Sequence, residues 1–452
     1  MNLLGELETF IGRKINPSLI WECPTIEKLT EYLAREDSSD VPISTRQKID
    51  LKSEVNQYPT ISVENILGKS SGNLSNIFLT GGTGFLGSFL LDELLQKTHS
   101  QIYCLVRASS QDLGQQKIQK KLELYGLWQP EFNRRIIPVL GDLSHPLLGL
   151  SEKQFERLAN EIDAIYHSGA SLNYVYPYEK LKPINVDGTY EVLKLASTTK
   201  VKSVHYMSSI AVFESDLYRE MVITESDDLM NVGQMYLGYS QSKWVAEKLV
   251  LSARERGLPV AVYRLPFISG HSLTGVWNTD DIICRMIKGC ITMKTMPDLD
   301  YVLNTSPVDY ISQAIVSLST QEMSLGSIFH LNNPYPIHLS HLHEFLSNMG
   351  YGIEKKTCKD WLAGVQNNAK SNDHSLYPLL PFFTKEYLPE KLTILELYEE
   401  QRKPKVSCKI TKEALADSSI DCPPMNGNLL NNYFAYLMDT GFLNQPKSHI
   451  EK

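Results

Sequence analysis

A tyrosine and a lysine four residues apart are the residues of this sequence best suited to acid catalysis. Reduction of a carbonyl by hydride needs a proton donor near the developing alkoxide. A tyrosine serves when a nearby cation lowers its pKa from about 10. In the YSQSK segment at 239–243 the spacing puts Tyr239 and Lys243 on one helix face. The ammonium can then stabilise a phenolate and also reach the ribose of a cofactor.

The Tyr-x-x-x-Lys pattern alone selects nothing, because it begins at Tyr176, Tyr178, Tyr190, Tyr239, Tyr351 and Tyr387. Order along the chain decides between them. Only Tyr239 begins a predicted helix soon after the fifth predicted strand, whose end carries two serines. Ser209 is preferred over Ser208 as the hydroxyl that holds a substrate oxygen. The predicted catalytic residues are therefore Ser209, Tyr239 and Lys243.

A glycine-rich turn, TGGTGFLG at 80–87, lies upstream of these residues. Its glycines at 81, 84 and 87 directly follow a predicted strand and open a predicted helix. This arrangement permits a tight turn, a close approach of the backbone to a pyrophosphate, and a helix N-terminus that faces the anion. The turn predicts a dinucleotide site with contacts from Thr80, Gly81, Gly84, Phe85, Leu86 and Gly87.

An arginine follows the second predicted strand, where NAD-specific enzymes usually carry an acidic residue. The guanidinium of Arg107 suits the 2′-phosphate of NADP, which a carboxylate would repel. We therefore expect NADPH as the cofactor, the alternative being that Arg107 is a solvated strand end. Asp142 and Leu143 follow the third predicted strand and are expected at the adenine. A turn aspartate is an equally good interpretation of Asp142.

Two asparagines follow the fourth predicted strand, near the expected position of the nicotinamide. Asn185 is expected to contact the cofactor, and Asn173 to orient it or a water molecule. Both also suit local capping of loops and helices. His167, at a strand end, and His205, within a strand, are expected to be packed imidazoles.

Short β-type runs alternate with helical patterns through the middle of the chain, which predicts a doubly wound parallel sheet of the Rossmann type. The predicted strands are 77–80, 102–106, 136–140, 164–167, 204–207 and 260–264. The predicted helices are 85–97, 111–125, 152–160, 182–196 and 239–255. The α/β domain is assigned to 71–270, and a smaller substrate and carrier-docking lobe with short strands such as 327–331 to 271–445.

The composition of the chain disfavours several classes of function. The chain has 452 residues, 42% hydrophobic and 21% charged, with a net charge of −8, which disfavours binding to nucleic acid. No apolar run suffices for a membrane span, and we expect a cytoplasmic protein. The seven cysteines lack metal-ligand spacing, so reduced thiols and no metal are expected.

The ordered set TGGTGFLG, LVRA, GDL, SGASLNYVYPY, NVDGT, SS, YSQSK and TSPVDYI resembles the thioester reductase domains of nonribosomal peptide and polyketide synthases. These domains belong to the extended short-chain dehydrogenase superfamily, and the likeness covers roughly residues 74–440. It implies NADPH-dependent release of an acyl chain from a carrier-bound phosphopantetheine thioester as an aldehyde, sometimes reduced on to the alcohol. It also implies the Ser209, Tyr239 and Lys243 trio, although threonine is more usual at the serine position. The RLPF segment at 264–267 departs from the usual Arg-Pro-Gly.

The N-terminal piece, 1–36, resembles the second half of an acyl carrier domain, with helical spacing at 3–11 and 25–34. The pantetheine-bearing Asp-Ser-Leu motif of that family is missing, so the expected partner is a separate phosphopantetheine-bearing carrier domain. The chain looks like the end of a larger synthase or a product of internal translation, the alternative for this piece being a simple helical cap. Residues 37–70 are polar and patternless, and are assigned to a linker.

Three other functions compete with thioester release. A free-standing fatty acyl-CoA reductase shares the fold and the trio but takes a soluble thioester. A non-catalytic NADP-binding module would not need all three catalytic residues. A nucleotide-sugar epimerase or dehydratase shares the scaffold but acts on nucleotide sugars.

Overall fold

The computed structural model describes residues 10–11, 25–33, 49–64, 66, 74–227, 229, 232–368, 376, 379–387, 392–399 and 404–446. Most of the predicted carrier-like piece at 1–36 lies outside these residues. Within it, α3 (Ile26–Leu33) matches the helix predicted at 25–34.

Seven parallel strands form the central sheet, in the order β12-β7-β5-β4-β1-β2-β3. They are β1 (Asn76–Thr80), β2 (Gln101–Val106), β3 (Ile136–Leu140), β4 (Ala164–His167), β5 (Ser203–Ser209), β7 (Val260–Leu265) and β12 (Ile328–His330). The strand order reverses between β1 and β4. In such sheets ligands bind in the crevice outside the carboxyl ends of the strands at this point.

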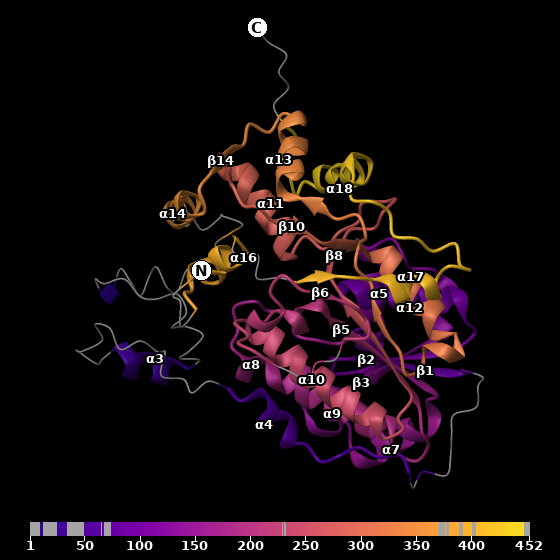
Figure 1. The fold of residues 1–452 in the computed structure, drawn as a ribbon. Helices are drawn as coiled ribbons and strands as arrows, with labels where there is room; N and C mark the ends of the chain where they lie inside the picture. Colours follow the sequence, from indigo (N-terminus) through magenta and orange to yellow (C-terminus); the bar gives the residue numbers. More distant parts are fainter. Residues whose placement is uncertain are drawn as a thin grey trace.

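Helices cover both faces of the sheet (Figure 1). One layer holds α5 (Phe85–Lys97), α6 (Gln111–Leu124) and α12 (Val308–Ser319). The other holds α7 (Glu152–Glu161), α8 (Tyr178–Lys182), a π-helix (Pro183–Asp187), α9 (Gly188–Ala196) and α10 (Gly238–Glu255). Within β1, the side chains of Ile77 and Leu79 pack under the layer of α5, α6 and α12, and that of Phe78 packs under the other layer. Successive strand residues point to opposite faces of the sheet.

A helical lobe with its own apolar core lies above the sheet in Figure 1. Its helices are α11 (Ile282–Met293), α13 (Leu339–Asn348), α14 (Cys358–Asn368), α15 (Leu380–Thr384), α16 (Ile394–Glu399) and α18 (Gly427–Asp439). Helix α17 (Lys409–Ala414) packs beside β12. The other strands of the described residues form four pairs: β6 (Val222–Ile223) with β15 (Lys405–Val406), β8 (Phe267–Ser269) with β11 (Thr305–Pro307), β9 (Thr295–Pro297) with β14 (Glu354–Lys356), and β10 (Val302–Leu303) with β13 (Ile337–His338).

The strands and helices predicted for the α/β domain are all present, with ends within a few residues of the prediction. The central sheet extends beyond the domain boundary predicted at residue 270. Strand β12 pairs with β7, and α12 packs on α5, so the domain draws its seventh strand and a covering helix from 305–330. The chain leaves the sheet after β7 and returns to its edge, which sequence order alone does not show.

Residues 49–63, predicted as part of a patternless linker, are instead built onto the α/β domain. Helix α4 (Leu51–Asn56) begins at Asp50, whose carboxylate accepts hydrogen bonds from the amides of Lys52 and Ser53. Leu51 is 4% exposed and joins the core that lies under α10. The apolar side chains of residues 49–63 are too few to form a core of their own, but they pack on the apolar surface of the α/β domain.

Polar contacts fix the same segment to the start of the α8 region. Glu54 forms an ion pair with Lys182 at 2.6 Å and accepts a hydrogen bond from the Tyr178 hydroxyl at 2.8 Å. The Tyr58 hydroxyl donates to the Asp187 carboxylate. The segment is therefore part of the α/β domain.

No helix among the described residues is long and apolar enough to cross a membrane. Nor do those residues contain a group of three or more histidine, cysteine or acidic side chains that would hold a metal ion. The six cysteines described are free and buried, at 104, 284, 290, 358, 408 and 422.

Leu51→Ala tests whether α4 belongs to the fold. Truncation of a buried leucine removes apolar contacts and leaves a cavity, so the free energy of unfolding should fall by about 2–4 kcal/mol. Denaturant melts check this, with the exposed Lys52→Ala as the control, expected to change stability by less than about 0.5 kcal/mol. Equal stability of the two variants would mean that the segment does not pack on the domain.

Candidate active site

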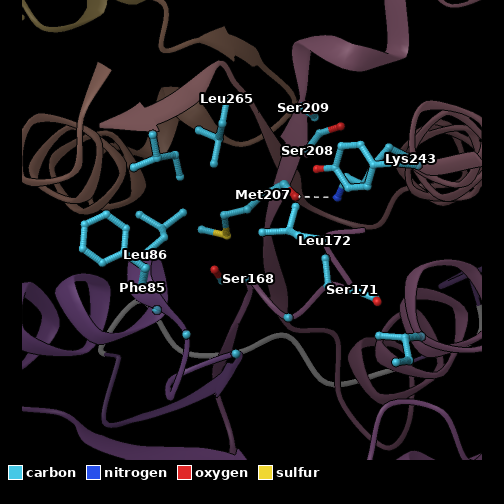
Figure 2. Close-up of a pocket in the computed structure, with 18 of the residues that line it drawn as sticks. Phe85, Leu86, Ser168, Ser171, Leu172, Met207, Ser208, Ser209, Lys243 and Leu265 are labelled. Atoms are coloured by element: carbon cyan, nitrogen blue, oxygen red, sulfur yellow. Dashed lines mark hydrogen bonds between the residues drawn. The ribbon is translucent and has the colours of Figure 1, made fainter. Parts of the chain in front are cut away.

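A cleft of about 680 Å³ opens at the carboxyl ends of the central strands. Its walls come from the β1–α5 turn, the ends of β2, β3, β4, β5 and β7, and the start of α10. Figure 2 shows Phe85 and Leu86 on one side of this cleft, with Ser208, Ser209 and Lys243 across from them. The predicted turn and the predicted catalytic residues therefore line one space.

The glycines of the turn meet steric conditions that other residues would violate. Gly81 has φ +79°, and a Cβ there would lie 2.7 Å from the amide nitrogen of Gly169. A Cβ on Gly87 would lie 1.9 Å from the Gly81 carbonyl oxygen. Helix α5 begins directly after Gly84, so its first amides face the cleft without intrahelical partners. The turn fits the pyrophosphate of a dinucleotide.

Thr80, predicted to contact the cofactor, lies behind the turn and does not line the cleft. It is fully buried, and its hydroxyl accepts from the Gly169 amide at 3.0 Å and bonds to His167 Nδ1 at 2.7 Å. His167 Nε2 bonds to Thr189 at 2.9 Å. Burial lowers the pKa of His167 to about 3, so it is the neutral, packed imidazole that the sequence predicts.

Two cations stand at the end of the cleft beyond the turn. Arg107 lines the cleft at the end of β2, and Lys117 of α6 lines it beside Arg107, with its ammonium 3.1 Å from the Arg107 carbonyl oxygen. Lys117 was not predicted, because the helical pattern at 111–125 does not tell which of its lysines faces the sheet edge.

Asp142 and Leu143 also line the cleft. The Asp142 carboxylate accepts from the amide and hydroxyl of Ser144, both at 2.9 Å, which is the turn role considered for it. Burial favours the neutral carboxyl, but the Ser144 hydrogen bonds and the charge of Arg107 together hold the pKa of Asp142 below its ordinary value. The two interpretations of Asp142 are therefore compatible.

The two serines at the end of β5 have different partners. The Ser208 hydroxyl donates to a carboxylate oxygen of Glu247, which is fully buried and also pairs with Arg264 at 2.7 Å. Ser209 is only partly buried; its hydroxyl accepts from the Ala211 amide at 3.2 Å and lies close enough to Tyr239 to lower the pKa of that tyrosine. Ser209 is thus the serine whose side chain is directed to Tyr239, in accord with the preference stated from sequence.

Tyr239 and Lys243 lie on the cleft side of α10, and both are largely buried. Burial raises the pKa of Tyr239 to about 12, opposed by the hydrogen bond with Ser209. Burial lowers the pKa of Lys243 to about 7, opposed by the nearby Glu247. The tyrosine is therefore a protonated hydroxyl at neutral pH, able to donate.

The asparagines serve the loop and helix roles considered for them. Asn185 does not line the cleft; its side chain exchanges hydrogen bonds with the backbone of Ser171 and donates to Ser242 at 2.9 Å. It ties the loop after β4 to α10. The Asn173 carboxamide accepts from the amides of Val175 and Tyr176, both at 2.9 Å.

Aromatic side chains form the wall beyond Tyr239. The Tyr174 ring lies 5.7 Å from that of Tyr239, 6.2 Å from Phe267 and 5.8 Å from Phe382 of the helical lobe. Phe267 belongs to the segment that departs from the usual Arg-Pro-Gly. That segment, Leu265 to Ile268, lines the cleft with apolar surface.

The remaining Tyr-x-x-x-Lys tyrosines do not line the cleft among the described residues. Tyr178 bonds to Glu54, Tyr190 packs against Tyr58, and the Tyr351 hydroxyl donates to the Asn444 carbonyl. Order along the chain was sufficient to exclude them.

Residues 79–315 match the family model described as "Male sterility protein". The chain belongs to this family. A solved structure, the terminal R domain from the myxalamid PKS-NRPS biosynthetic pathway, is 40% identical, with a TM-score of 0.81 over 88% of this chain and 100% of that one. The match confirms the predicted Rossmann fold of the extended short-chain dehydrogenase type.

Curated relatives of this male sterility family member are longer proteins. A linear gramicidin synthase polypeptide of Brevibacillus parabrevis is 38% identical over 94% of this chain and 8% of its own length. The L-2-aminoadipate reductase large subunit of Penicillium chrysogenum is 32% identical over 82% of this chain and 28% of its own length. The chain therefore spans less than a third of either relative. These similarities identify an oxidoreductase domain of the reductase type.

Gly87→Ala tests the turn of this family member. The added Cβ would meet the Gly81 carbonyl oxygen, so the turn must open and lose its fit to the pyrophosphate. Affinity for a reduced nicotinamide dinucleotide should fall at least about tenfold, a loss of about 1.4 kcal/mol, in fluorescence titrations. Gly364→Ala in α14 is the matched control, because a Cβ there meets no atom within 4 Å. Undiminished affinity in Gly87→Ala would exclude the turn as the phosphate site.

Proposed function

We propose that the chain is a thioester reductase that uses NADPH to release an acyl or peptidyl chain from a carrier domain as an aldehyde. The observation that carries the proposal is that Ser209, Tyr239 and Lys243 line the same cleft as the glycine turn. The printed names of the relatives, a linear gramicidin synthase and an R domain of a PKS-NRPS pathway, support a carrier-bound thioester as substrate.

The roles of the catalytic residues follow from their partners. Ser209 and Tyr239 hold the thioester carbonyl oxygen between their hydroxyls, and Tyr239 donates its proton as negative charge develops there. The Lys243 ammonium lies on the same helix face and stabilises the phenolate that remains. NADPH, when bound, would supply the hydride; the thioester would then become a hemithioacetal, which would collapse to an aldehyde and a free thiol.

NADPH is proposed over NADH because two cations line the far end of the cleft. Arg107 offers a planar fork to a 2′-phosphate, and Lys117 adds a second positive charge beside it. Asp142 lines the cleft and is held ionised by hydrogen bonds from Ser144, so an adenine is the part of the cofactor expected beside it.

The carrier domain is the proposed partner, since the substrate chain reaches the site on a phosphopantetheine arm. The wall formed by Tyr174 and Phe267, with Phe382 packed against Tyr174, suits the apolar part of an acyl or peptidyl chain. A free-standing fatty acyl-CoA reductase would use the same catalytic residues on a soluble thioester. Substrate comparison separates the two functions.

The purified protein, given NADPH and an acyl chain on a phosphopantetheinylated carrier domain, should oxidise NADPH and yield an aldehyde detectable by mass spectrometry. Tyr239→Phe should lower kcat at least about 100-fold, because the proton donor is lost, while the NADPH dissociation constant changes less than about twofold. Product analysis also reports any alcohol.

Absence of thioester-dependent NADPH oxidation would refute the proposed function. Faster turnover of acyl-CoA than of the carrier-bound chain would instead support the free-standing reductase. Full activity in Tyr239→Phe would remove Tyr239 from the acid role.

Arg107→Ala and Lys117→Ala test the cofactor preference. Each should weaken NADPH binding about 10- to 100-fold, the effect expected for a lost charge-assisted hydrogen bond, and should leave NADH binding unchanged. Lys120→Ala is the control, because Lys120 is an exposed lysine of the same helix that does not line the cleft. Parallel losses for NADPH and NADH would contradict a 2′-phosphate contact.

A further inference from the structure

The Lys243 ammonium is held from behind the cleft by the end of β5. Its Nζ donates to the Tyr206 hydroxyl at 3.0 Å and to the Met207 carbonyl oxygen at 2.8 Å. The second bond is drawn in Figure 2. The same Nζ lies 4.5 Å from the centre of the Tyr206 ring, within range of a cation–π interaction. Tyr206 is 1% exposed and Lys243 is 3% exposed, so water contributes little to either contact.

The Tyr206 hydroxyl lies beside a buried chain of polar groups. Thr189, which opposes the effect of burial on the pKa of Tyr206, donates its hydroxyl proton to the Asn185 carbonyl at 2.7 Å and bonds to His167 Nε2 at 2.9 Å. His167 in turn bonds to Thr80 behind the glycine turn. The Tyr206 oxygen accepts from the Lys243 ammonium, which has donors only and no lone pair of its own.

We propose that Tyr206 is a positioning residue that keeps the Lys243 ammonium charged and aimed at Tyr239. The inference rests on the proposed function of Lys243 and Tyr239. Tyr206 does not line the cleft, and it acts on the reaction only through the ammonium that it holds.

The charged and titratable groups around Lys243 are either neutral or already bonded to other partners, so Tyr206 is the side chain that holds the ammonium. Glu247 favours the ammonium, but its carboxylate already bonds to Arg264 and Ser208. His167, on β4, is neutral because burial depresses its pKa to about 3. Tyr239, on α10, is neutral at ordinary pH. Burial, opposed by Glu247, lowers the pKa of Lys243 to about 7, and each lost hydrogen bond to the charged form would lower it further.

Tyr206→Phe keeps the ring and removes the acceptor. The ammonium is the active form of Lys243, so activity falls as pH rises through its pKa. A lower pKa in the variant should therefore move the alkaline limb of the kcat profile for thioester reduction about one pH unit towards acid. The NADPH dissociation constant, measured across the same pH range by fluorescence, should begin to rise at a correspondingly lower pH.

Tyr166→Phe is the matched control. Tyr166 is also 1% exposed, lies on the neighbouring strand β4, and donates its hydroxyl proton to Ser319 at 2.6 Å, away from Lys243. Its loss should lower the Tm without moving either pH curve. Thr189→Val, which leaves both Tyr206 and Lys243 unaltered, should produce a smaller shift in the same direction and provides a test if Tyr206→Phe does not fold.

Wild-type thioester turnover with superimposable pH curves for wild type and Tyr206→Phe would overturn the inference and leave the proposed function standing. Absence of thioester turnover in the wild type would refute the proposed function, and the binding curves would then decide the role of Tyr206 alone. An equal shift of the pH curves in Tyr166→Phe would also overturn the inference, because the shift in Tyr206→Phe would then reflect general destabilisation of the sheet.

Discussion

A buried ion pair between Glu247 and Arg264 joins the helix that carries the candidate catalytic residues to the sheet. Neither side chain is exposed, and two guanidinium nitrogens lie 2.9 and 2.7 Å from one carboxylate oxygen. Loss of one partner would strand a buried charge at a cost of about 3–5 kcal/mol. Because Tyr239, Lys243 and Glu247 are spaced by four, this pair sets the rotation of α10 that turns the first two towards the cleft.

Much of the α/β domain was predictable because a buried parallel strand is a continuous apolar run. The bounds of β3 and β4 agree residue for residue with the sequence prediction. Strand β12 was assigned to the lobe because its neighbour in space, β7, is far away in sequence. Helix α4 was missed although Leu51, Val55 and Tyr58 have helical spacing after a capping Asp50, since one turn and a half of pattern is weak evidence.

Candidate site residues could be predicted from sequence where the order of the strands and helices places them, but not where the choice depends on contacts between side chains in space. Parallel topology brings every strand's carboxyl end to one edge, which selects Tyr239 and Ser209 without coordinates. Asn185 fits both a cofactor contact and a structural tie, and its bonds to Ser171 and Ser242, which show the tie, could not be read from the sequence. Lys117 and Tyr206 required knowledge of which way a helix or strand side chain points.

The distribution of charge along the cleft favours one orientation of a bound ligand. Cationic Arg107 and Lys117 line one end, while the carboxylates of Glu214 and Asp281 line the other, beside the aromatic wall. A ligand with phosphates at one end is attracted to the first pair and repelled by the second. Behind the cleft, two sets of buried polar groups are already hydrogen-bonded: Thr80 with His167 and Thr189, and Ser208 with Glu247. The groups that face the cleft are thus held in position before a ligand arrives, and little ordering remains to oppose its binding.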